Sequence, residues 1–380
     1  MNFEPSKINC MDKLEKFIQT RLSNYHVERN FDFGSHDRSN TSCLSPYISH
    51  GIISEIDIIK SSIKDHSIEK IEKFIQEVLW RVYWKGWLEL RPNVWLDFIK
   101  DLKFEKKKFL NNKNYINAIN GNTEIKCFND WVNELRNTNY LHNHARMWFA
   151  SIWIFTLKLP WQLGAEFFLE NLFDGDPASN TLGWRWVAGI QTIGKNYLAK
   201  EENIKKFTKN KYRNILLNEI APPIEIKIQY PLINNEFLNP DIIKKKSLLI
   251  FDNNLSFETS NFFNKNFKKI FIINNNSRKI KLSNNVNIFK NRLIEDQEKR
   301  LRDLSINCEI IQIDELKNLS NEAYALYPCI GENLDFLTEN NIDNIKFLYR
   351  ELDTFSWKYC KKGFFNFKNY IPEIINNFNC

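Results

Sequence analysis

FDGDPASNTLGWRWVAG, residues 173–189, is the stretch that decides how this chain is interpreted. Two acids flank a glycine, and Asp176 stands directly before Pro177. An acid at the cap and a proline at the first helical position mark a helix start. Asn180 then falls in the first turn, near free backbone N–H groups and the positive end of the helix dipole. The stretch therefore predicts a helix whose first turn either binds an electron-rich ligand or is only capped.

The composition around this stretch is aromatic and mildly basic. The 380 residues include 30 Phe, 13 Tyr and 11 Trp, and the length is enough for two domains. Lys and Arg outnumber Asp and Glu by seven. Such a balance favours acidic partners, of which nucleic acid is the commonest, but it also follows from a sequence rich in Lys, Asn and Ile.

The cysteines and the N-terminus bear on the compartment. Seven cysteines are scattered, and none forms a C-x-x-C pair, so the usual spacing of zinc and iron–sulfur ligands is missing and we expect no metal. An odd, scattered set suggests free thiols in a reducing compartment. The sequence has no apolar signal core and no run of about 18 apolar residues. We therefore expect a cytoplasmic protein that does not enter a membrane.

The chain divides into a helical part and an α/β part. Ten of the eleven tryptophans precede residue 187, which indicates two domains. Residues 1–210 are expected to be helical, with helices over 68–90, 141–159 and 161–172. A proline-punctuated linker follows over 211–245. In 246–380, short apolar runs alternate with an amphipathic helix over 286–305, which predicts a parallel sheet with strands over 247–252, 269–274, 308–313, 323–328 and 346–352.

Two more segments of the helical part carry polar groups at the start of a helix. In TSCLSPYISHG, residues 41–51, Ser45 can cap a helix that Pro46 begins, and the loop offers hydroxyl and amide donors for phosphate oxygens. The alternative is an N-cap without a ligand. In LHNHARMWFAS, residues 141–151, His142 and Arg146 share a face. A buried Arg146 needs a carboxylate, and Asp174 is the natural candidate.

A fourth segment, EVLWRVYWKGW, residues 77–87, aligns Glu77, Trp80, Arg81 and Trp84 on one side of a helix. An aromatic stripe at this spacing is usually core. Glu77 beside Trp80 does not fit a plain core, because its carboxylate has to be solvated, paired or functional.

Taken together, the four segments resemble the FAD-binding domain of the DNA photolyase and cryptochrome family, closest to the cyclobutane pyrimidine dimer photolyases. The resemblance runs from Tyr25 to Thr208. It implies an all-helical photolyase-type domain that holds a bent FAD. Together with the alternating pattern of 246–380, this gives an expected fold of class α + α/β, in which a smaller Rossmann-like α/β domain follows the helical one. The family normally begins with an α/β antenna domain, and we expect this chain to lack that domain at its N-terminus. Residues 246–380 weakly resemble that domain, so a relocated antenna domain is our hypothesis; whether a second chromophore binds is left open.

The resemblance implies a set of cofactor residues. It places Tyr25 and the 41–45 segment around the phosphates and ribityl chain, the pair of Arg146 and Asp174 beside the isoalloxazine, and Asn180 opposite its redox-active nitrogen. Cys43 stands where an arginine is common. The full implied set is Tyr25, Thr41, Ser42, Leu44, Ser45, Gln76, Arg81, Asn143, Arg146, Asp174, Asp176 and Asn180.

The resemblance also implies residues for the substrate and for electron transfer. Trp80 and Trp186 would stack on flipped pyrimidines, and Glu77 would hydrogen-bond their carbonyl edges. Asn143 and Met147 match the dimer photolyases rather than the (6-4) enzymes, whereas His144 departs from a frequent arginine. Trp184 and Trp161 match the first two members of the family's photoreduction chain. The third has no match, and Trp148, Trp153 or an aromatic residue elsewhere could take its place.

The implied function is a light-driven carbon–carbon lyase. Reduced FAD excited by blue light would pass an electron to a cyclobutane pyrimidine dimer in DNA and regain it after the ring splits. Asn180, a neutral amide where plant cryptochromes carry aspartate, favours repair. The alternatives are a cryptochrome-like photoreceptor with little repair activity and an aromatic-rich helical protein without cofactor. A monomer is expected.

Overall fold

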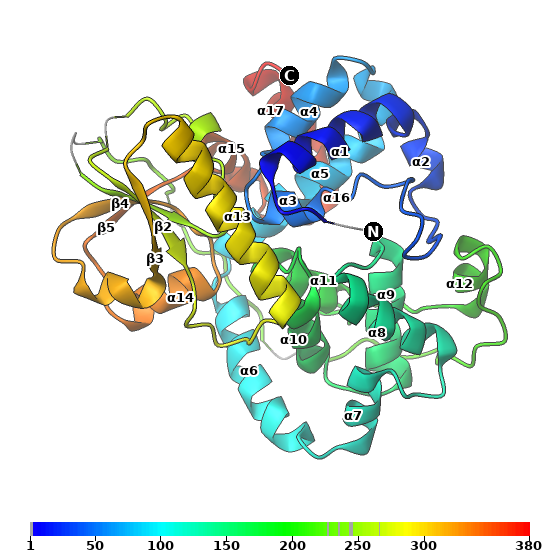
Figure 1. Ribbon diagram of the computed structural model, residues 1–380. Coiled ribbons are helices and arrows are strands. Elements are labelled where there is room, and N and C mark those ends of the chain that lie inside the picture. The colour runs from blue at the N-terminus through cyan, green and yellow to red at the C-terminus, as the bar shows by residue number, and fades with distance from the viewer. Residues whose placement is uncertain (1–2, 226–227, 235, 243–245, 266) are drawn as a thin grey trace.

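The computed structural model describes residues 3–225, 228–234, 236–242, 246–265 and 267–380, and it divides into a helical part and an α/β part (Figure 1). The helical part comprises α1 (Lys7–Thr20), α2 (Tyr25–Glu28), α3 (Ser45–Ser49), α4 (Glu55–Ile63), α5 (Ile68–Glu89), α6 (Asn93–Phe109), α7 (Lys113–Asn120), α8 (Lys126–Thr138), α9 (Asn143–Ser151), α10 (Trp161–Asn171), α11 (Pro177–Val187) and α12 (Glu201–Phe207).

Three of these helices confirm the sequence predictions, and one differs. α5 and α10 span the predicted ranges, and α11 begins at Pro177 with Asp176 as its cap, whose side chain accepts from the Ser179 N–H. The helix expected over 141–159 is shorter: α9 begins after His142, whose Nδ1 accepts from the His144 N–H. Beyond Ser151 the chain widens into a π-helical turn over Ile152–Thr156, so the regular helix ends there.

Close packing of α10 on α11 fixes one aromatic side chain. A Cβ added at Gly164 on α10 would lie 2.3 Å from the indole of Trp184 on α11. Only glycine allows this approach, and the Trp184 ring is 2 % exposed as a result. The two helices therefore hold the indole in one position.

The α/β part is a five-stranded parallel sheet, as predicted. Its order is β3-β2-β1-β4-β5, with β1 (Leu248–Phe251), β2 (Ile270–Asn274), β3 (Cys308–Gln312), β4 (Ala323–Leu326) and β5 (Ile345–Leu348). Alternate residues of β1 face opposite sides. Leu248 and Ile250 share a core with α13 (Asn284–Asp303), whereas Leu249 and Phe251 share one with α14 (Glu332–Glu339). Helices therefore cover both faces of the sheet.

The end of the chain returns to the helical part. After β5 the chain forms α15 (Glu351–Ser356), α16 (Phe364–Phe367) and α17 (Ile371–Asn377), which lie beside α4 and α5 (Figure 1). A Cβ added at Gly86 on α5 would lie 2.4 Å from the ring of Trp357, so this contact is tight. Residues 351–380 thus pack with the helical part, although they follow the last strand.

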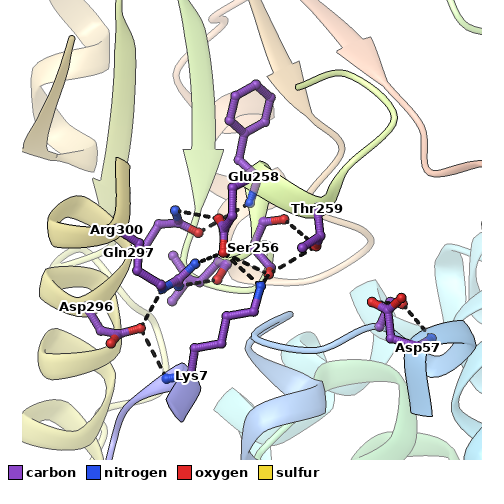
Figure 2. A network of polar contacts seen from close by, with 11 residues as sticks. Lys7, Asp57, Ser256, Glu258, Thr259, Asp296, Gln297 and Arg300 are labelled. Atoms are coloured by element: carbon purple, nitrogen blue, oxygen red, sulfur yellow. Dashed lines mark hydrogen bonds and ion pairs between the residues drawn. The ribbon is translucent and has the colours of Figure 1, made fainter. Parts of the chain in front are cut away.

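A polar network joins the two parts a second time, at the start of α1 (Figure 2). The Lys7 ammonium donates to Ser256 Oγ at 2.5 Å and to Glu258 Oε1 at 2.8 Å, and the Lys7 N–H donates to Asp296 Oδ2 at 3.3 Å. Arg300 on α13 binds both acids. The α/β part is therefore attached directly at α1, and the segment that follows its last strand packs on α5.

The predicted linker over 211–245 can be compared with the structure only at its described residues. Residues 226–227, 235 and 243–245 of the 211–245 range lie outside the described residues; the rest of the range forms neither helix nor strand. No helix within the described ranges has both the length and the apolar content needed to cross a bilayer. The seven cysteines are free thiols.

Candidate functional site

Two adjoining chambers lie between α2, α5, α9, α11 and the 41–45 segment. The large chamber has a volume of about 430 Å³ and the small chamber about 160 Å³. They adjoin each other, because they share eight lining residues: Arg29, Asn30, Glu77, Arg81, Asn143, His144, Arg146 and Asp174. The predicted site residues from four separate segments are therefore brought to one place.

A buried acid with two cations stands where the chambers meet. Asp174 Oδ2 lies 3.0 Å from Arg146 Nη2 and 3.9 Å from Arg81 Nη2. Burial would raise the pKa of Asp174, but the guanidinium groups of Arg146 and Arg81 outweigh it and hold the pKa below its ordinary value. Arg146 is oriented from its other end, because its Nε donates to the Leu141 carbonyl at 2.9 Å. The acid is therefore ionised at neutral pH.

Several polar atoms in the lining are left unsatisfied. Within the residues that the structure describes, Asp174 Oδ1, Ser179 Oγ and Trp184 Nε1 are buried without a hydrogen-bond partner. Native proteins rarely leave such groups unpaired, since each costs about 1–3 kcal/mol. All three residues line the large chamber. The lining therefore suits a ligand that offers both hydrogen-bond donors and acceptors.

The first turn of α11 presents Asn180 to the large chamber. Its Nδ2 donates to the carbonyl of Ala165 on α10 at 2.9 Å, which fixes the amide. One turn further along, Gly183 faces open space: a Cβ there would meet no described atom within 4 Å. The helix thus offers an oriented amide and an unobstructed backbone.

The small chamber is lined by the hydroxyl-rich loop before α3. Thr41, Ser42, Leu44 and Ser45 line it together with Tyr25. The predicted capping role of Ser45 is wrong: α3 begins at Ser45 itself, Leu44 occupies the cap position, and no described side chain caps this helix. Cys43, directly before Leu44, has a φ of 52°, a left-handed backbone conformation that is uncommon for a residue other than glycine.

Glutamate and indole groups form the outer wall of the large chamber. Glu77 Oε1 lies 2.5 Å from Arg29 Nη1, so this acid is paired. Trp80 stacks on Phe364 of α16 with ring centroids 3.5 Å apart, and Trp186 stacks on Tyr197 at 5.5 Å. One face of each indole is therefore already covered by another ring. Met147 and Asn143 of α9 complete this wall.

Three of the predicted site residues, Gln76, Trp161 and Asp176, line neither chamber in the described structure. Gln76 donates along α5 to Glu72 at 2.6 Å, and Trp161 stacks on Phe98 at 5.4 Å. Asp176 caps α11 and lines a third cavity of about 40 Å³, between α5, α11 and the carboxyl ends of β1 and β4. The side chain of each is committed to protein partners.

The structure also adds residues that the sequence analysis did not single out. Arg29 and Asn30, directly after α2, line both chambers, and Phe168 of α10 and Leu172, directly after α10, line the large chamber. Arg29 and Asn30 directly follow Tyr25–Glu28, so their closeness in sequence to the predicted site residue Tyr25 was the only feature that could have indicated them. Phe168 and Leu172 carry no signal, since they are ordinary apolar residues of a buried helix.

The aromatic neighbours of Trp184 differ from the predicted order. Its closest indole among the described ring contacts is Trp153, with centroids 6.2 Å apart, and Phe168 lies at 5.1 Å. Trp153 in turn contacts Tyr115, which is half-buried, at 6.1 Å. A path of rings therefore leads from the chamber through Trp153 toward the surface.

Part of the lining of these chambers lies in a segment that matches a known domain. Residues 74–212 match the family described as the FAD binding domain of DNA photolyase. The deoxyribodipyrimidine photo-lyase of Buchnera aphidicola subsp. Baizongia pistaciae is 30 % identical over 260 residues, 63 % of this chain and 54 % of that protein. The Vibrio cholerae protein of the same name is 27 % identical over 191 residues, 49 % of this chain and 40 % of that protein. The chain thus spans about half the length of these relatives.

Among solved structures, a bacterial class III photolyase from Agrobacterium tumefaciens is 26 % identical in sequence, with a TM-score of 0.46; the match covers 54 % of this chain and 43 % of that chain.

Proposed function

Because residues 74–212 match the family described as the FAD binding domain of DNA photolyase, we propose that this chain is a light-dependent DNA repair flavoprotein that splits cyclobutane pyrimidine dimers. One observation carries the proposal: Asp174 Oδ1 is buried without a partner in the described structure, beside Arg146 and Arg81. An isoalloxazine ring has an imide N–H between two carbonyl oxygens. That edge complements an acceptor flanked by guanidinium groups.

The residues of both chambers fit the rest of the cofactor. Thr41, Ser42 and Ser45 would hold the phosphates through hydroxyl and backbone N–H groups, and Arg81 adds positive charge. When bound in its reduced form, FAD supplies the light-driven transfer of one electron to the dimer and its return. Asn180 offers a neutral amide whose Nδ2 is held by the Ala165 carbonyl, so no negative charge is added beside the ring. This choice is consistent with repair.

The outer wall fits a flipped pyrimidine pair. Trp80 and Trp186 are each held by a stacked ring and both line the large chamber, so their indoles are placed to stack on a base there. Glu77, when ionised, can only accept hydrogen bonds, so its partner on a pyrimidine is a ring N–H rather than a carbonyl. Met147 lines the same chamber. Glu77, Trp80, Met147 and Trp186 are the residues that we assign to the substrate, and Asn143, shared by both chambers, borders both ligands.

Two measurements test the proposal on the full chain. The purified protein should show flavin absorbance, and after reduction and blue illumination it should restore thymines in an oligonucleotide that contains one thymine dimer. A colourless protein with intact fold would reject the flavin. A yellow protein that is photoreduced but leaves the dimer intact would reject repair and favour the cryptochrome-like photoreceptor.

A further inference from the structure

A short C-terminal segment, KKGFFNF at residues 361–367, lies along α5 beside the large chamber. The Lys361 carbonyl accepts from Arg91 at 2.7 Å, and the Lys362 carbonyl accepts from the Tyr83 hydroxyl at 3.0 Å. Phe364 then stacks on Trp80, which lines the chamber. The segment is therefore fixed at three points between the end of α5 and the outer wall of the site.

The side chains that this segment exposes are one aromatic ring and two cations. Phe365 is 82 % exposed, although the neighbouring Phe364 is 5 % exposed. Lys361 and Lys362 are exposed, and neither forms an ion pair with any described residue. Lys368, by contrast, is paired with Glu72 at 3.1 Å. Phe365, on α16, therefore presents an apolar ring to solvent beside two unpaired cations.

Aromatic and cationic groups continue along the same side of α5. Trp84 and Trp87 are half-buried, and the Arg91 guanidinium lies 4.2 Å from the Trp87 ring. Alternating aromatic rings and cations suit single-stranded nucleic acid, in which bases stack on rings and phosphates meet cations. A second copy of this chain is a poorer fit, because it would bring the same cations together.

We propose that residues 361–365 form a second nucleic-acid contact next to the mouth of the large chamber. The proposal rests on the proposed function, which places a flipped nucleotide in that chamber. Phe365 stacks on a base adjoining the flipped nucleotide, and Lys361 and Lys362 bind phosphates of the same strand. Phe364 positions this contact, because its ring holds the turn against Trp80.

The test measures binding of labelled oligonucleotides, with and without one thymine dimer, to the full chain in the dark. Phe365→Ala should weaken binding about tenfold, since stacking on one base is lost. Phe365→Trp should restore it. The double variant Lys361→Ala/Lys362→Ala should reduce the slope of log affinity against log salt by about 1.4 on single strands and about 1.8 on duplex.

Matched controls come from α6, which exposes the same residue types away from the chambers. Phe104 is 65 % exposed, and Lys107 and Lys108 are exposed. Phe104→Ala and Lys107→Ala/Lys108→Ala should bind as the unmodified chain does. The inference is overturned if Phe365→Ala weakens binding no more than Phe104→Ala, or if no oligonucleotide binds at all.

The repair assay separates this inference from the proposed function. If the unmodified chain splits dimers but Phe365→Ala binds normally, the contact is wrong and repair stands. If Phe365→Ala weakens binding while the illuminated, reduced chain leaves dimers intact, the contact stands and repair is wrong. Tighter binding of RNA than of DNA in the same measurement would overturn the assignment of the strand as DNA.

Discussion

The carboxylate of Glu77 lies 2.5 Å from the guanidinium of Arg29, at the border that the two chambers share. The two side chains are 34 % and 27 % exposed, and half-exposed ion pairs of this kind contribute about 0–1 kcal/mol to stability. The pair therefore matters mainly because it fixes where the carboxylate stands.

Replacing Glu77 should separate substrate binding from cofactor binding. In Glu77→Ala we expect affinity for dimer-containing DNA to fall about tenfold, because an acceptor facing the pyrimidine is lost, while flavin content and unfolding free energy change little. Arg29→Ala keeps the carboxylate and should lose less affinity. Equal loss of flavin and of DNA binding in Glu77→Ala would contradict the assigned role; absorbance and anisotropy measure the two.

Asp174 should be needed for flavin retention and for stability. Asp174→Asn removes the charge that pairs with Arg146, and breaking a buried pair costs about 3–5 kcal/mol. We expect the purified variant to lose most of its flavin absorbance and to unfold at lower denaturant. Because its folded pKa is depressed, the contribution of Asp174 is present above its unfolded pKa and is lost as pH falls through the folded pKa.

A pair outside the chambers provides the control for Asp174. Glu166 on α10 lies 2.6 Å from the Lys106 ammonium and lines neither chamber in the described structure. Glu166→Gln should keep the flavin whatever it does to stability. If it lost flavin as Asp174→Asn does, the effect would follow from general destabilisation.

Local signals predicted the elements, whereas long-range packing decided which side chains reach the chambers. Asp176 and Pro177 fix the start of α11 through neighbouring backbone groups, so this helix was predictable. The stack of Trp80 on Phe364 joins residues far apart in sequence, and no local pattern encodes it. Gln76 and Trp161 were assigned by resemblance alone, which fixes an aligned position but not the direction of a side chain.

The order of the aromatic rings gives a prediction for photoreduction. Trp184 contacts Trp153, whereas Trp161 stacks on Phe98. Trp153→Phe should therefore slow light-driven reduction of the oxidised flavin more than Trp161→Phe does, and Trp184→Phe should slow it most. Transient absorbance with an external reductant measures the rates. A greater effect of Trp161→Phe would instead support the electron-transfer order that the resemblance implies, from Trp184 to Trp161.

At the junction between the two parts, Glu89 lies in an environment that disfavours its ionised form. Glu89, the last residue of α5, is buried and accepts from the Ile330 N–H at 2.7 Å and from the Tyr327 hydroxyl at 2.8 Å. Burial raises its pKa to about 7, and these two hydrogen bonds offset only part of that effect. The folded chain thus holds a proton on Glu89 that the unfolded chain releases near the ordinary value of 4.5.

The stability that this proton confers should disappear as pH rises. A raised carboxyl pKa means that the folded state binds more protons between pH 4.5 and about 7, so the unfolding free energy falls across that window and levels off above it. Glu89→Gln, neutral at every pH, should remove about 1–3 kcal/mol of this fall between pH 5 and pH 8. His50, whose pKa burial lowers to about 4, contributes the opposite trend, but the comparison with Glu89→Gln cancels it. Denaturant unfolding at pH 5 and pH 8 measures the difference. Glu15→Gln, on the exposed side of α1, is the control. Identical pH dependence of the unfolding free energy in Glu89→Gln and in the unmodified chain would mean that Glu89 is ionised throughout this range.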